Sequence, residues 1–213
     1  MTGKIVTVFG GSGFLGRHLV RALCKQGWRV RVAMRRPHLG GDVKLAGDVG
    51  QVQLVQANVR NRPSIERALE NADAAVNLVA IMHERGAQTF AGTQSLGAGN
   101  IARLAAEAGI SQFVYVSAIG ADAKSRSVYA RTKAEAEAAT LAAIPTAVIL
   151  RPSIMFGPED GFFTRFARMA RMTPVLPLIG GSTKFRPVYV GNVSDAVAAA
   201  LARKDDVQLE NLG

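Results

Sequence analysis

The sequence predicts an α/β protein built on a doubly wound parallel sheet with helices on both faces. An apolar run over 5–9 leads into a glycine-rich turn over 10–16, and an amphipathic segment follows and stops at Gly27. Further short apolar runs alternate with segments of helical period, as parallel βαβ units require; these runs cover 28–34, 52–57, 74–79, 113–116 and 147–150. A chain of 213 residues, 48% of them hydrophobic, is long enough to bury one domain of this class.

The glycine turn has the spacing of a site for the pyrophosphate of a dinucleotide. Gly10 permits a sharp turn, Gly13 lets backbone N–H groups approach the phosphates, and Gly16 lets the helix pack closely on the strand. The N-terminus of the helix also carries a partial positive charge that favours an anion. A plain structural turn is the alternative, but the flanking strand and helix favour phosphate binding. The predicted binding residues are Gly10, Gly11, Ser12, Gly13, Phe14, Leu15 and Gly16.

Two arginines at the end of the second strand indicate which dinucleotide binds. NAD-selective sites place an acidic residue there to hold the 2′-hydroxyl of the ribose. Here Arg35 and Arg36 occupy the position, with no Asp or Glu nearby, and guanidinium groups match a 2′-phosphate in charge and geometry. A solvated basic turn is the alternative. The sequence therefore favours NADP(H) over NAD(H).

Other predicted cofactor contacts follow the third and fourth strands. Asn58 and Val59 end the third strand, where they could lie against the adenine, and a short helix over 61–70 follows them. Small residues at the end of the fourth strand suit close passage of the cofactor, although plain packing would select them too; they are Val79, Ala80 and Ile81. A long helix is predicted over 90–108.

A candidate reaction centre follows the fifth strand. The strand ends at Ser117, and Tyr129 and Lys133 lie four residues apart, which puts them on one face of the next helix. A lysine ammonium beside a phenol is expected to lower the phenol's pKa, which makes Tyr129 a usable general acid or base. Ser117 could donate a hydrogen bond to the same substrate oxygen. The spacing alone is also ordinary for a helix surface, but the glycine turn upstream favours the catalytic interpretation.

Five segments together resemble the short-chain dehydrogenase/reductase superfamily, of the extended or atypical type. They are VFGGSGFLG from Val8, VSAIGAD from Val116, YARTKAE from Tyr129, LRPSIMFGPED from Leu150 and RPVYVGNV from Arg186. Within the superfamily these segments are most similar to the group that contains the 39-kilodalton accessory subunit of respiratory complex I and its bacterial relatives. The bacterial relatives are described as NAD-dependent epimerase/dehydratase-like or hydroxysteroid-dehydrogenase-like.

The resemblance implies roles for particular residues and a bound NADP(H), used structurally in the mitochondrial case. Ser117, Tyr129 and Lys133 match the catalytic trio, with Lys133 also reaching the nicotinamide ribose. Pro152 and Ile154 would lie beside the nicotinamide. Two departures stand out. Gln94 occupies the place of an asparagine that relays protons in many extended members, and Phe185 stands where sugar-nucleotide epimerases often carry a diphosphate-binding arginine.

The chain is predicted to divide into a Rossmann domain over 1–156 and a segment over 157–213, which forms a partial substrate lobe plus a last strand and helix that return to the Rossmann domain. The lobe contains an amphipathic segment in which Arg165, Arg168 and Arg171 recur every third residue beside phenylalanines and methionines. A lid helix with a solvated basic edge would explain this pattern, and so would a surface for an acidic partner protein or an anionic membrane. Asn192 is predicted to precede the last helix. Because family members usually continue further, the lobe is expected to be incomplete.

Composition and charge exclude several other classes of protein. The formal net charge is +10, but the arginines are scattered and lack interleaved aromatics, so no nucleic acid partner is expected. No Cys, His or carboxylate cluster has metal-ligand spacing, and the single Cys24 fits a reducing compartment. No apolar run is long enough to span a membrane, and no signal or transit peptide is expected before the first strand. These features favour a cytoplasmic protein, free or peripheral to the inner membrane, and the resemblance implies a bacterial origin.

Two main functional hypotheses remain open on the sequence, and a third is a redox or nucleotide sensor whose affinity for a partner depends on the state of the cofactor. The first is an NADP(H)-binding accessory protein of complex I or a similar assembly. The second is a free-standing NADPH-dependent oxidoreductase, or an epimerase or dehydratase, acting on a small carbonyl or hydroxyl substrate. The intact trio of Ser117, Tyr129 and Lys133 supports the second, because a purely structural cofactor needs no tuned phenol.

Overall fold

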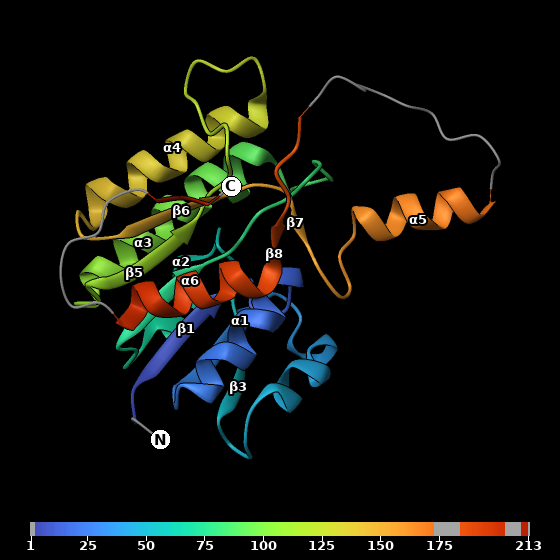
Figure 1. Cartoon of the computed structure of the whole chain (residues 1–213). Helices are drawn as coiled ribbons and strands as arrows, with labels where there is room; N and C mark the ends of the chain where they lie inside the picture. The colour runs from blue at the N-terminus through green and yellow to red at the C-terminus, as the bar shows by residue number, and fades with distance from the viewer. Residues whose placement is uncertain (1–2, 173–183, 203–209, 213) are drawn as a thin grey trace.

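The computed structural model describes residues 3–172, 184–202 and 210–212, and these form a seven-stranded parallel sheet. The strand order is β3-β2-β1-β4-β5-β6-β9 (Figure 1). The strands are β1 (Ile5–Phe9), β2 (Arg29–Met34), β3 (Val52–Gln56), β4 (Ala74–Asn77), β5 (Gln112–Val116), β6 (Val148–Pro152) and β9 (Glu210–Leu212). The predicted doubly wound α/β fold is confirmed.

Helices cover both faces of the sheet. Helices α1 (Phe14–Lys25) and α6 (Val190–Ala202) pack on one face, and α2 (Arg62–Leu69), α3 (Leu96–Glu107) and α4 (Val128–Ala143) pack on the other. Alternate residues of a strand face opposite sides. In β5, Val114 and Val116 contact the first layer while Phe113 and Tyr115 contact the second. Because both faces are buried, the strands read as nearly continuous apolar runs.

The strand order reverses between β1 and β4, and this reversal positions the site. The chain moves outward through β2 and β3 on one side and through β5 and β6 on the other. The connections after β1 and β4 therefore diverge and leave a crevice at the carboxyl ends of the two strands. In open α/β sheets, ligands bind in this crevice. The glycine turn follows β1 and borders it.

Two predicted boundaries need correction. The helix predicted over 90–108 is a π-helical segment over Phe90–Ser95 continued by α3, with Gln94 buried at the junction. Helix α6 begins at Val190, directly after the short strand β8 (Val188–Tyr189), so Asn192 lies inside the helix and does not cap it. Between β2 and β3 the chain also forms a 3₁₀ helix over Gly41–Ala46, whose Val43 is buried in the core.

Part of the predicted substrate lobe forms a small unit beside the sheet. Strands β7 (Met155–Phe156) and β8 (Val188–Tyr189) pair in parallel, and α5 (Phe163–Met172) stands apart from the main layers (Figure 1). The rest of the predicted lobe, at 173–183, 203–209 and 213, lies outside the described residues. Among the residues that are described, no helix is both long and apolar enough to cross a bilayer.

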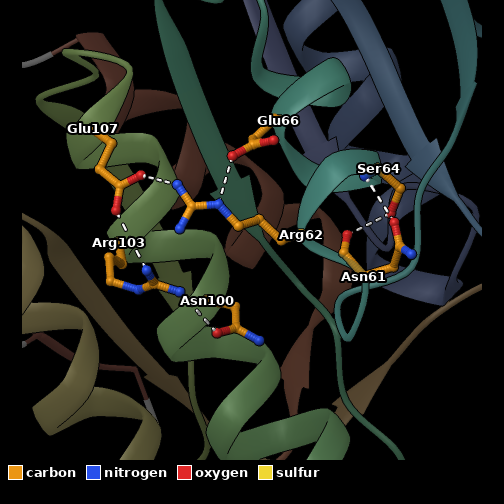
Figure 2. Close-up of polar contacts among 7 residues, drawn as sticks. All are labelled: Asn61, Arg62, Ser64, Glu66, Asn100, Arg103 and Glu107. Atoms are coloured by element: carbon orange, nitrogen blue, oxygen red, sulfur yellow. Dashed lines mark hydrogen bonds and ion pairs between the residues drawn. The ribbon is translucent and has the colours of Figure 1, made fainter.

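A network of exposed ion pairs joins α2 to α3 at the surface (Figure 2). Arg62 donates to Glu107 on α3 and to Glu66 on its own helix, each at 2.6 Å, and Arg103 reaches Glu107 at 3.4 Å. Exposed pairs of this kind contribute at most about 1 kcal/mol each. The network therefore aligns two helices that are already held by buried apolar contacts.

Candidate functional site

The glycine turn forms a cradle that no other residue type would fit. Gly10 has φ +81°, a left-handed conformation that side chains rarely adopt. A Cβ on Gly16 would lie 2.5 Å from the carbonyl oxygen of Gly10 and from the carbonyl carbon of Gly11. Helix α1 starts at Gly13 without a side-chain cap or an acidic residue in its first turn. Its first N–H groups therefore remain available to an anion, as the sequence predicted.

A cavity of about 270 Å³ opens beside this cradle, at the carboxyl ends of β1 to β4. Nine of the predicted cofactor contacts line it: Gly10, Ser12, Gly13, Arg35, Asn58, Val59, Val79, Ala80 and Ile81. The walls are mostly apolar, with a few polar groups at the rim, which suits the adenosine half of a dinucleotide. The residues present therefore fit a dinucleotide, which would lie across the strand-order reversal.

The turn after β3 is held in place by two helices. The Ser64 hydroxyl accepts from the backbone N–H of Asn58 at 2.9 Å, and Asn61 caps α2 by accepting from the Ser64 N–H. From α3, the Asn100 side-chain amide donates to the Val59 carbonyl at 3.3 Å. Asn58 and Val59 thus line the cavity from a braced turn. Figure 2 shows Asn61 beside Ser64 at the start of α2, and Asn100 on α3.

Beyond the adenosine cavity lies an arginine basin, lined by Arg17, Arg35, Arg36 and Arg85. It shares Ser12, Met34, Arg35 and Gln88 with the cavity, so the two spaces are continuous. Asp42 is the one carboxylate in its lining, and it lies 3.5 Å from Arg17. The basin is therefore strongly cationic, at the place where the sequence predicted a 2′-phosphate.

The structure gathers the predicted catalytic residues around the carboxyl end of β5. Ser117 follows the strand, and its buried hydroxyl has no hydrogen-bond partner among the described residues. Lys133, on α4, donates from Nζ to the carbonyl oxygen of Val116 at 3.0 Å. Tyr129 lies one turn earlier on α4, half-buried, with its ring 6.0 Å from that of Phe90. Pro152 ends the adjacent β6, and Ile154 follows it.

The pKa of Tyr129 departs from the sequence expectation. Burial raises the pKa of the phenol above its ordinary value, whereas the sequence predicted that Lys133 would lower it. The physical reason is that burial removes water from the phenol. The Lys133 ammonium bonds the Val116 carbonyl and lies 5.0 Å from the centre of the Tyr115 ring. In this structure the phenol therefore keeps its proton at neutral pH.

Lys133 is itself perturbed by its surroundings. Its side chain is fully buried, and burial lowers the pKa of the ammonium to about 8, while Glu137 one turn later opposes the shift. Glu137 is buried and paired with Arg151 of β6, whose Nε donates to it at 2.9 Å. This pair lies behind the candidate site. Of the two partners, the Glu137 carboxylate raises the pKa of the Lys133 ammonium and so limits the effect of burial.

The titration of Lys133 predicts a pH-dependent difference in stability for Lys133→Met. Because the folded-state pKa of about 8 lies below the ordinary lysine value of 10.5, charging Lys133 destabilises the fold at low pH. This penalty is full below pH 8 and disappears as the pH rises to 10.5. The free energy of unfolding of Lys133→Met minus that of the parent should therefore decrease by about 3 kcal/mol between pH 8 and pH 10.5. Urea unfolding at the two ends measures it, and a constant difference would contradict the shift.

Gln94 occupies the place at which the resemblance expects an asparagine. Its side chain is fully buried and accepts from the Ile81 N–H at 3.3 Å. It also donates to the Thr132 hydroxyl at 3.1 Å and to the Tyr129 carbonyl at 3.5 Å. Gln94 therefore links the strand end that lines the cavity to the helix that carries Tyr129. Its amide is occupied by these contacts.

Sequence reasoning missed two members of the arginine basin. Arg17 lies one turn after Gly13 on α1, and this spacing could have placed it beside the phosphate turn. It donates to Glu159 at 2.8 Å and to the Ser12 carbonyl at 3.2 Å. Arg85 lies in the connection after β4, where no local pattern marks it. In the described part of the chain, no group of three or more His, Cys, Asp or Glu residues could hold a metal ion.

Curated relatives agree with the predicted resemblance. The chain is 40% identical over 209 residues to the mitochondrial NADH dehydrogenase [ubiquinone] 1 alpha subcomplex subunit 9 of Arabidopsis thaliana, covering 97% of this chain and 52% of the relative. It is 32% identical over 198 residues to a ceramide reductase of Caulobacter vibrioides, covering 93% of this chain and 60% of the relative. The chain thus spans little more than half the length of these relatives. The predicted resemblance to the complex I subunit group is confirmed.

Solved structures show the same fold, and a family model identifies the family. The Bordetella bronchiseptica enzyme WbmG in complex with NAD matches with a TM-score of 0.77 at 17% identity, covering 100% of this chain and 74% of that one. The UDP-N-acetylglucosamine 4-epimerase of Bacillus cereus matches with a TM-score of 0.73 at 20% identity, covering 99% and 76%. These likenesses show the fold. The family model described as "NAD dependent epimerase/dehydratase family" matches residues 6–213. With this match added to the glycine cradle and the parallel sheet, the chain belongs to the NAD dependent epimerase/dehydratase family.

Proposed function

We propose that this protein binds NADP(H) in preference to NAD(H), with the arginine basin holding the 2′-phosphate. The observation that carries the proposal is the continuity of the basin with the adenosine cavity. Arg35 lines both spaces and Arg36 lines the basin, directly after β2, where an NAD site would place a carboxylate. Guanidinium groups bind a phosphate through paired, charge-assisted hydrogen bonds. Binding of the nicotinamide dinucleotide itself is supported by the family model and by the NAD-bound WbmG.

The Arg35→Ala/Arg36→Ala double variant tests this preference. Each lost charge-assisted contact is worth about 1.5 to 3 kcal/mol, so NADPH affinity should fall at least about tenfold. NADH affinity should change little, because NADH has no 2′-phosphate. Fluorescence titration with both nucleotides measures the ratio of dissociation constants. Lys25→Ala/Arg29→Ala is a matched control, since it removes the same charge from exposed positions at the amino end of β2. Equal losses for both nucleotides would refute the assignment.

We also propose that Ser117, Tyr129 and Lys133 form a reaction centre for a carbonyl or hydroxyl group. When bound, the nicotinamide would supply or accept a hydride. Tyr129 is suited to give a proton to the substrate oxygen, and the Ser117 hydroxyl is suited to donate a hydrogen bond to the same atom. Lys133 would hold the nicotinamide ribose, and Pro152 and Ile154 would border the nicotinamide. The unpartnered Ser117 hydroxyl supports this role, because a buried hydroxyl without a partner costs free energy.

The cofactor bound at this site could serve a structural role or a catalytic one. As an accessory protein of complex I or a similar assembly, the chain would hold NADP(H) structurally, and its relationship to the Arabidopsis subunit favours this use. As a free-standing oxidoreductase, or an epimerase or dehydratase, it would turn the cofactor over, and the buried lysine and the unpartnered serine favour that use. We propose the NADP(H)-binding, complex I subunit-like role first, with catalysis as the second candidate.

One purification distinguishes the two uses. The protein is purified without added nucleotide, and the nucleotide it retains is identified by mass spectrometry. It is then assayed with NADPH against a panel of small carbonyl compounds. Retained NADP(H) that is not consumed in the presence of any carbonyl supports the accessory role. Steady consumption that depends on the carbonyl supports the enzyme.

A further inference from the structure

A cluster of exposed aromatic rings and arginines lies beside the sheet, in the small unit formed by β7, β8 and α5. We call it the aromatic–arginine patch; its members are Phe156, Phe162, Phe163, Phe166, Tyr189, Arg165, Arg168 and Arg171. The five rings are each between 38% and 43% exposed. Neighbouring rings lie 5.1 to 6.3 Å apart, from Phe166 at one end to Tyr189 at the other. A contiguous apolar surface of this kind on a monomer marks an interaction site.

Helix α5 carries most of the patch and buries none of its residues. Figure 1 shows it apart from the layers of the main sheet. It is nevertheless held in position. Asp160 accepts from the backbone N–H groups of Phe163 and Thr164, and the Phe163 ring packs edge-on against Phe156 of β7. The patch is therefore a positioned surface.

All charged side chains of the patch are positive. Helix α5 contains three arginines and no carboxylate, and the arginines project on the side opposite Phe163 and Phe166 at helical spacing. Among the described residues, no carboxylate lies within ion-pair distance of these arginines. The two nearest acidic residues in the chain are engaged elsewhere: Glu159 pairs with Arg17, and Asp160 caps the helix. Within residues 3–172 and 184–202, no carboxylate thus compensates the cationic charge beside the rings.

We propose that the aromatic–arginine patch docks the protein on an anionic lipid bilayer. An in-plane amphipathic helix buries phenylalanines in the boundary between headgroups and acyl chains while its arginines meet anionic headgroups. Aromatic rings are enriched at that depth. The helix, its rings and its unpaired arginines match these three requirements together. An acidic protein would match the charge but leaves the row of half-exposed rings without an assigned role.

Vesicle co-sedimentation of the whole 213-residue chain tests the proposal. Vesicles of phosphatidylcholine alone are compared with equimolar phosphatidylcholine and phosphatidylglycerol. Binding is expected to the anionic vesicles and should weaken as salt is added. Arg165→Gln/Arg168→Gln/Arg171→Gln should lower the partition coefficient about 100-fold, since each basic residue contributes about 1 kcal/mol near an anionic surface. Phe162→Ser/Phe166→Ser should lower it at least about tenfold.

Two matched controls distinguish binding through the patch from non-specific binding to vesicles. Lys4→Gln/Lys25→Gln/Arg29→Gln removes the same charge from exposed positions at the amino edge of the sheet, and Leu45→Ser/Val49→Ser removes two exposed apolar side chains elsewhere. Both controls should bind as the parent does. All variants are checked for an unchanged thermal midpoint and NADPH affinity, which keeps this test independent of the proposed cofactor preference.

Three results would overturn the proposal. The first is an absence of binding to the anionic vesicles. The second is binding that the patch variants and the controls weaken equally. The third combines two observations: vesicle binding is absent, and sedimentation velocity shows concentration-dependent self-association that the phenylalanine variant abolishes. The patch would then bind a second copy of the chain.

Discussion

Valine in place of Gly16 is expected to abolish dinucleotide binding and to lower the free energy of unfolding by about 3 kcal/mol. Even the first added carbon would lie 2.5 Å from the Gly10 carbonyl oxygen and from the Gly11 carbonyl carbon. Both are backbone atoms of the phosphate turn, so no side chain can rotate away to relieve the contact. The turn or the start of α1 must shift, and the N–H groups that would face the pyrophosphate shift with it.

Gly41→Val is the matched control for this change. A Cβ at Gly41 meets nothing within 4 Å, and the residue is exposed. Urea unfolding and NADPH titration are measured on both variants, and the control should resemble the parent in each. If Gly16→Val binds NADPH as tightly as the parent, the turn would not be the pyrophosphate site.

Phenylalanine in place of Tyr129 is expected to reduce any carbonyl turnover about 100- to 10,000-fold, the usual contribution of a general acid. The substitution removes the phenolic proton but keeps the ring and its contact with Phe90. Because the phenol is suited to contact substrate rather than the adenosine half of the cofactor, the dissociation constant for NADPH should not change. The experiment measures kcat and the dissociation constant for NADPH, and the proposed role requires kcat to fall while the dissociation constant stays the same.

Tyr189→Phe provides the control, since it removes a hydroxyl of the same kind from the exposed small sheet. It should leave turnover unchanged. If Tyr129→Phe also leaves turnover unchanged, the catalytic interpretation of the trio is wrong, even though NADP(H) binding could still hold. A protein that retains NADP(H) but shows no turnover before mutation instead supports the accessory role.

Local features of the sequence were enough to predict the elements and the phosphate turn. The turn depends on residues within seven positions of one another, because the positive φ of Gly10 and the packing of Gly16 are short-range requirements. Strand and helix periodicity are likewise local, so the alternation that leads to a parallel sheet could be followed along the chain. The start of α6 escaped prediction because a two-residue strand runs directly into the helix.

Contacts between distant segments could not be predicted in the same way. Arg85 is close to Arg35 only because the connection after β4 returns over the end of β2. Lys133 and Tyr129 share a helix face, as the spacing indicated, but the lysine bonds the Val116 carbonyl seventeen positions away and leaves the phenol's pKa raised. The Glu137–Arg151 pair, which influences Lys133, also joins a helix to a strand.

The sequence by itself determined the fold class, the phosphate turn and the residue types of the candidate reaction centre, because each depends on short-range geometry. The tertiary structure alone decided which arginines form one basin, which way the Lys133 ammonium points, and that the rings of α5 remain exposed. Those outcomes depend on how segments far apart in the chain pack against one another. Burial and neighbouring charge, which set a group's pKa and its availability to a ligand, are properties of that packing.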